Sequence, residues 1–157
     1  MEGWKRLEGD LSTWLKSQVR SGLVFRGSYQ AIPGFPTDSF RSDGLLTDGK
    51  ILIALEVEAG QMHPDTNVGK YWLLNSTHPY EKIVLFHVYT PDFNSYGWRK
   101  QLGEFYATKM LREVPIEYIQ FDLRQATDYD ATLAKLRSDI GARVLKEFPP
   151  RNGAPAV

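Results

Sequence analysis

The chain has 157 residues, of which 42% are apolar and 13% aromatic, which excludes a disordered protein and suffices for one hydrophobic core. The 19 basic and 19 acidic residues cancel, so no overall electrostatic field attracts nucleic acid, and any such contact must come from a local patch. Because the sequence contains no cysteine, disulfide bonds and zinc–thiolate sites are excluded.

The sequence predicts one soluble domain. No apolar run approaches the roughly 20 residues of a membrane span, and the N-terminal residues lack the apolar segment of a signal peptide. We therefore expect a cytoplasmic protein with no membrane contact. No repeat or linker divides the chain, so the expected domain covers residues 1–148, and the proline- and glycine-rich residues 149–157 form a flexible tail.

Hydrophobic periodicity and turn residues define nine elements in the order helix, three strands, helix, strand, helix, strand, helix. Helices are predicted over residues 3–20, 65–75, 95–112 and 128–147. Strands are predicted over residues 23–29, 39–47, 50–58, 82–89 and 116–123, with a proline-containing loop over 31–36. Since helices separate the last strands, crossover connections are needed, and we expect an α/β fold whose mixed sheet is covered on both faces.

The first predicted helix carries an acidic residue on its apolar side. At about 100° per residue, Glu8 falls within the sector of Trp4, Leu11 and Val19, which faces the core. A carboxylate there is costly unless it finds a partner or a metal ion. Glu8 is therefore a candidate supporting residue, and the alternative is that it reaches solvent at the edge of the apolar stripe.

Residues 41–58 predict a β-hairpin. Asp48-Gly49 is typical of a two-residue type I′ turn, in which both central residues have positive φ. With that turn, Asp43 pairs with Ala54 and lies one diagonal step from Glu56.

The predicted hairpin carries three carboxylates on one face. Side chains alternate along a strand, so Glu56 and Glu58 point the same way, and Asp43 shares their face. Diagonal neighbours lie about 7–8 Å apart at the backbone, a gap that two carboxylates can close around one divalent cation. Two alternatives need no metal: the acidic face is solvated, or Arg41 offsets the charge.

The segment that follows the hairpin is polar where a purely structural helix would show an apolar stripe. Asn67, Lys70 and Tyr71 fall at i, i+3 and i+4 and share one helix face. Gln61 lies just past the end of the strand. These four residues are candidate site residues; the alternative is a solvated Lys70 and a Tyr71 that packs in the core.

The histidines do not suggest a metal site. No pair has the spacing of metal ligands, such as His-x-x-x-His. His87 lies within the apolar strand over 82–89, and we expect it to be a core residue whose polar atoms are satisfied.

The order of elements over residues 3–123, with Asp43 in the second strand and Glu56-Val57-Glu58 ending the third, resembles the PD-(D/E)XK nuclease superfamily. The resemblance implies a restriction-endonuclease-like fold. It also implies that Asp43 and Glu56 bind Mg²⁺, for which Mn²⁺ is a possible substitute.

The chain departs from the family pattern at Glu58, where the family usually has lysine. Some restriction endonucleases of the superfamily have Glu there, and in other members the lysine lies on the following helix, a place that Lys70 fills. Exonuclease-like branches carry Gln-x-x-x-Tyr on that helix, of which Asn67-x-x-x-Tyr71 is a loose variant. Several branches use a glutamate of the first helix, which corresponds to Glu8.

The implied function is that of a Mg²⁺-dependent DNA endonuclease of restriction or repair type, with RNA as an alternative substrate and a homodimer as an open possibility. Asp43 and Glu56 would bind the metal, Glu58 would bind it or orient the attacking water, and Lys70 would contact the phosphate or help to deprotonate the water. One alternative is a catalytically inactive module of the same fold that binds nucleic acid or a protein. Another is a purely structural domain.

Overall fold

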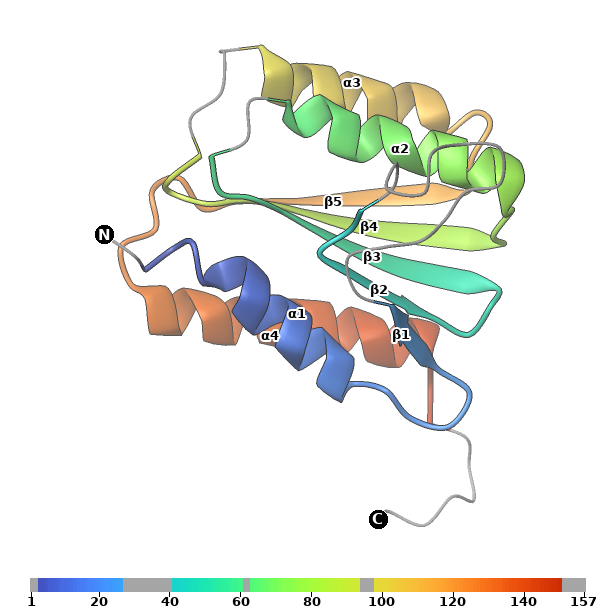
Figure 1. The fold of residues 1–157 in the computed structure, drawn as a ribbon, viewed down its shortest axis with the longest axis horizontal. Helices are drawn as coiled ribbons and strands as arrows, with labels where there is room; N and C mark the ends of the chain where they lie inside the picture. Colours follow the sequence, from blue (N-terminus) through green and yellow to red (C-terminus); the bar gives the residue numbers. More distant parts are fainter. Residues whose placement is uncertain (1–2, 27–40, 61–62, 94–97, 151–157) are drawn as a thin grey trace.

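A computed structural model describes residues 3–26, 41–60, 63–93 and 98–150 of the protein (Figure 1). The helices are α1 (Leu7–Ser17), α2 (Pro64–Thr77), α3 (Arg99–Met110) and α4 (Tyr129–Glu147). The strands are β1 (Val24–Arg26), β2 (Gly44–Thr47), β3 (Ile51–Glu58), β4 (Lys82–Tyr89) and β5 (Ile116–Asp122). Within these ranges, no helix combines the length and apolarity that crossing a membrane requires. Gln61, the predicted loop over 31–36 and the tail from residue 151 lie outside the described residues.

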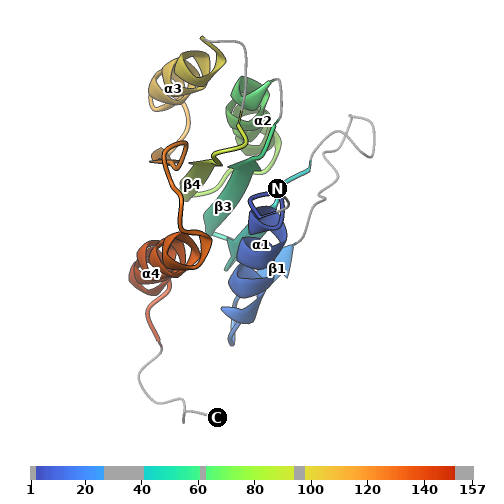
Figure 2. The same cartoon turned by 90° about the vertical axis from the view of Figure 1, so that its left-hand side faces the viewer.

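The strands form one mixed sheet in the order β1-β2-β3-β4-β5. Neighbours β1, β2 and β3 are antiparallel, whereas β3, β4 and β5 are parallel and are connected through α2 and α3. Helices α2 and α3 cover one face of the sheet and α1 and α4 cover the other (Figures 1 and 2). The α/β fold class, the order of elements and the mixed sheet expected from the sequence are therefore confirmed, and they are consistent with a restriction-endonuclease-like domain.

Strand β3 lies between two hydrophobic cores. Ile53, Leu55 and Val57 belong to the core under α1 and α4, while Leu52 and Ala54 belong to the core under α2 and α3. The predicted alternation of faces is therefore confirmed, and the side chains of Glu56 and Glu58 point to the same face as Leu52 and Ala54, which α2 covers. Because helices cover this side and both glutamates are buried, the hypothesis of a solvated acidic face is wrong.

The predicted hairpin register is wrong by two residues. Thr47 pairs with Leu52 and Gly44 with Leu55, so the ladder continued by one step sets Asp43 opposite Glu56. A type I′ turn needs positive φ at both central residues, but only Gly49 has it, at 92°.

The side chain of Asp48 explains the wider loop. Its Oδ1 accepts hydrogen bonds from the backbone N–H groups of Lys50 and Ile51, at 2.9 and 2.8 Å, which stabilises a turn that is too wide for type I′. Since the side-chain period of a strand is two, a shift of two residues leaves every residue on its predicted face.

The prediction that Glu8 faces the core is also wrong. The buried stripe of α1 consists of Leu7, Leu11 and Leu15, a narrow line at four-residue spacing. Glu8 lies about 100° around the helix from Leu7 and is exposed. Val19 lies beyond the end of the helix and is 44% exposed, so the apolar sector is narrower than the sequence suggests.

Two glycines provide a matched test of this backbone. We expect Gly49→Ala to destabilise the protein by about 1 kcal/mol, because an alanine at positive φ is strained. Gly69→Ala should stabilise it by about 0.5–1 kcal/mol, since Gly69 lies inside α2 and an added Cβ meets nothing within 4 Å. Urea unfolding measures both changes. If the free energy of unfolding shifts in the same direction in both variants, the conformation assigned to the turn at Gly49 or to the helix at Gly69 is wrong.

Candidate functional site

The carboxyl ends of the parallel strands are polar on the face under α2 and α3. The register places Glu56 beside His87, and His87 beside Gln120. One step further, Glu58 lies beside Tyr89, and Tyr89 beside Asp122. Towards the amino ends of the strands the same face is apolar. Sites in parallel α/β sheets lie at the carboxyl ends of strands, which makes this polar region the candidate site.

Glu56 is held by two residues of α2. The Nζ atom of Lys70 lies 2.7 Å from Oε1 of Glu56, and the hydroxyl of Tyr71 donates to the same oxygen at 2.5 Å. The Glu56 side chain is only 3% exposed, so it is an almost fully desolvated carboxylate with a cation beside it. Ser42, which precedes β2, has its Oγ 3.0 Å from the Tyr71 hydroxyl, so this hydrogen bond links α2 to the segment before β2.

Asp43 lies beside this pair. Its Oδ2 accepts a hydrogen bond from the backbone N–H of Val57 at 2.6 Å. Burial, the charge of Glu56 and the nearby charge of Glu8 raise the pKa of Asp43 to about 8, although the Val57 N–H and Lys70 act in the opposite direction. Burial also raises the pKa of Glu56, against the effect of Lys70. Two neighbouring carboxylates that resist ionisation form a site suited to a cation.

Glu58 is fully buried and belongs to a second cluster. Its Oε1 accepts a hydrogen bond from Nδ2 of Asn67 at 2.7 Å and lies 2.6 Å from Nε2 of His87. The other ring nitrogen of His87 lies 2.8 Å from the Tyr118 hydroxyl. Oε2 of Glu58 is buried and has no hydrogen-bond partner in the described part of the chain.

Lys70 joins the two clusters. Its Nζ donates to Oδ1 of Asn67 at 3.0 Å and to the backbone carbonyl of Arg41. The ammonium group thus contacts Glu56 directly and is linked to Glu58 through the side chain of Asn67. The guanidinium group of Arg41, which the sequence offered as a neutralising charge, is not what faces Glu56; Lys70 is.

The structure brings together most of the candidate residues. Hydrogen bonds and an ion pair connect Glu56, Glu58, Asn67, Lys70 and Tyr71. Asp43 lies close enough to Glu56 and Lys70 for their charges to shift its pKa. Glu8 is exposed, but it lies close enough to raise the pKa of Asp43. Gln61 lies outside the described residues.

Sequence reasoning missed the contributions of Ser42, His87 and Tyr118. His87 is buried and satisfied, as expected, but its partner is Glu58 rather than the apolar core. The available signal was a histidine inside an otherwise apolar strand. Identifying Glu58 as its partner also required the parallel register of β3 and β4, which the sequence does not specify.

The carboxylates offer oxygens to a cation. In the described residues, hydrogen bonds to Glu56 fall on Oε1 and the one to Asp43 falls on Oδ2, which leaves the second oxygen of each. No group of three or more His, Asp or Glu side chains in those ranges is disposed to hold a metal ion. Mg²⁺ commonly uses only one or two carboxylates, and waters and substrate phosphate oxygens complete its shell. Asp43 and Glu56 are therefore the two carboxylates that could hold such an ion.

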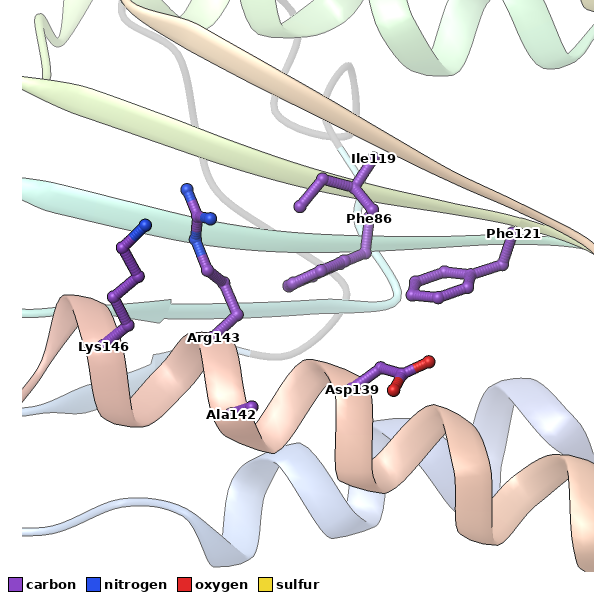
Figure 3. Close-up of a pocket in the computed structure, with 7 residues that line it drawn as sticks. All are labelled: Phe86, Ile119, Phe121, Asp139, Ala142, Arg143 and Lys146. Carbon is purple, nitrogen blue, oxygen red and sulfur yellow. The ribbon is translucent and has the colours of Figure 1, made fainter.

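Hollows lie on both sides of the sheet in the described part of the chain. A groove of about 500 Å³ between α2 and α3 includes Lys70 in its wall, together with Trp72 and Tyr106. A cavity of about 390 Å³ lies between the sheet and α4 on the opposite face, where Phe86 and Phe121 stack (Figure 3). No candidate residue lines this second cavity, whereas Lys70 lines the groove, so of these two hollows in the described part of the chain the groove adjoins the site.

Comparisons of the chain with family models, with characterised proteins and with solved structures find no match.

The raised pKa of Asp43 predicts how stability depends on pH. Unfolded Asp ionises near pH 3.9, whereas folded Asp43 keeps its proton to about pH 8, so its stabilising contribution is lost as the pH rises between these values. In EDTA, we expect the free energy of unfolding to fall by more than about 1 kcal/mol between pH 5 and pH 8.5 relative to Asp43→Asn. Urea unfolding measures this difference, and parallel pH profiles for the two proteins would contradict it.

Proposed function

We propose that the protein is a Mg²⁺-dependent phosphodiester hydrolase, an endonuclease of restriction or repair type that cuts DNA. The observation that supports this proposal is the convergence of Asp43, Glu56 and Lys70 at the carboxyl end of β3. Asp43 directly precedes β2, Glu56 lies in β3 and Lys70 lies in α2. A purely structural domain has no need for two adjacent desolvated carboxylates, because such groups are costly to bury.

In this proposal Asp43 and Glu56 hold the cation through Oδ1 and Oε2, the oxygens to which no hydrogen bond is made within the described part of the chain. When bound there, Mg²⁺ supplies an activated water and stabilises negative charge on the scissile phosphate. Asp43 must lose its proton to bind, so the raised pKa keeps the site close to neutral until a cation arrives. Glu58, buried beside the pair, orients the attacking water.

Lys70 provides the positive charge that the family usually places next to the second acidic residue. Its side chain is 16% exposed, forms part of the wall of the groove between α2 and α3, and contacts Glu56 at 2.7 Å. In this position the ammonium group contacts a phosphate oxygen of a substrate that lies along the groove. Since the net charge is zero, substrate binding depends on such local cations, and a homodimer would present two sets of them.

One observation favours a second candidate function. The Lys70–Glu56 ion pair already neutralises the carboxylate without a metal ion. In a catalytically inactive module of the same fold, this ion pair would be permanent, and the groove would bind nucleic acid or a protein without cleavage. The two proposals differ in whether the site takes up a divalent cation.

The first test is plasmid cleavage in Mg²⁺ with a matched set of carboxylate variants. We expect Asp43→Asn and Glu56→Gln each to reduce cleavage by on the order of 10²-fold or more, because each removes a charged metal ligand. Glu81→Gln is the control, since the ion-pair partner of Glu81 among the described residues is the exposed Lys50, at 3.4 Å. Cleavage that survives both site substitutions, or is lost equally in the control, would exclude this site.

The second test separates the metal site from the permanent ion pair. Lys70→Met removes the ammonium group from Glu56 and keeps much of its apolar stem. If the site is a nuclease centre, the variant binds Mg²⁺ at least as tightly as the unmodified protein in calorimetry, while cleavage falls by about tenfold or more. If neither protein binds Mg²⁺, the inactive module is the better description.

A further inference from the structure

His87 is a buried polar residue whose hydrogen bonds connect two parts of the site. It lies on β4, between β3 and β5, is 0% exposed, and has Nε2 2.6 Å from Oε1 of Glu58. The proposed reaction gives it no role. A histidine in an otherwise apolar strand, facing a carboxylate, therefore calls for a separate explanation.

The neighbouring tyrosines determine which nitrogen of His87 carries the proton. Nδ1 lies 2.8 Å from the Tyr118 hydroxyl and 3.3 Å from the Tyr89 hydroxyl. Burial raises the pKa of both hydroxyls, so both keep their protons. Nδ1 has a single lone pair, and the nearer hydroxyl, that of Tyr118, donates to it. Nε2 then bears the hydrogen and donates it to Glu58, which is the pattern by which buried imidazoles orient carboxylates.

Both donors to Glu58 act on the same oxygen. Asn67 Nδ2 and His87 Nε2 contact Oε1, whereas Oε2 is buried and has no hydrogen-bond partner among the described residues. A buried carboxylate oxygen without a donor is costly, and native proteins rarely leave one without a water or an ion. The clamp on Oε1 thus reserves Oε2 for a group outside the protein.

We infer that His87 is a positioning residue that holds Glu58 so that its Oε2 accepts a hydrogen bond from a water bound to the cation. The inference rests on the proposed metal site and adds a residue that the family pattern does not contain. Because Asn67 bonds both Glu58 and Lys70, the same clamp also fixes the ammonium group next to Glu56. Loss of His87 therefore disturbs the cation and the lysine together.

The experiment titrates Mn²⁺ into the full chain by calorimetry and compares three variants. His87→Leu removes the clamp and should weaken Mn²⁺ binding about 10- to 100-fold, the usual effect of losing a residue that orients a metal-site carboxylate. His87→Gln can donate from a similar position and should restore most of the affinity. Val88→Ala is the control, since Val88 is equally buried but belongs to the core on the other face; it should lower the melting temperature and leave Mn²⁺ affinity unchanged.

The outcomes distinguish the inference from the function on which it rests. If the unmodified protein binds no Mn²⁺, both are wrong. If it binds Mn²⁺ and His87→Leu binds it equally well, only the role of His87 is overturned. Should His87→Leu fail to fold, Tyr118→Phe replaces it, because it removes the hydroxyl that faces Nδ1 and keeps the ring. It should weaken Mn²⁺ binding in the same direction by a smaller factor, and unchanged affinity would overturn the inference.

Discussion

The burial of two glutamates on one face of a central strand is the constraint on which the rest of this structure depends. Glu56 and Glu58 are 2% and 0% exposed, and a charged carboxylate removed from water is costly unless charge and hydrogen bonds compensate. The compensation comes from two neighbouring elements. Helix α2 supplies Lys70, Tyr71 and Asn67, and strand β4 supplies His87.

This constraint explains the composition of α2. The helix packs on the sheet through Val68 and Leu74, but the face over the glutamates carries polar groups, which a helix with a purely structural role would replace with apolar side chains. Removing one partner of a buried ion pair strongly destabilises a protein. Replacing both partners by apolar residues of similar size, however, often leaves the stability of the protein unchanged or raises it. The retained charges therefore favour a role in function over a role in stability.

The sequence predicted the elements and the faces of the hairpin because both depend on local periodicity. Glu56 and Glu58 lie under α2 as the two-residue period requires, and Lys70 lies one helical turn from Asn67, as its spacing requires. The register was not predictable from Asp48-Gly49, since the Asp48 side chain stabilises a wider turn. The position of Glu8 and the partner of His87 depend on how elements pack, which periodicity does not specify.

The central claim is that Asp43 and Glu56 bind one divalent cation between them. A crystal of the protein soaked in Mn²⁺ tests this claim most directly, because anomalous scattering locates the ion. We predict an anomalous peak in direct contact with both carboxylates. The ammonium group of Lys70 is then displaced from Glu56 or shares that carboxylate with the ion. The claim would be contradicted if Mn²⁺ labels other carboxylates of the crystal but gives no peak at Asp43 and Glu56, and the Lys70–Glu56 ion pair stays intact.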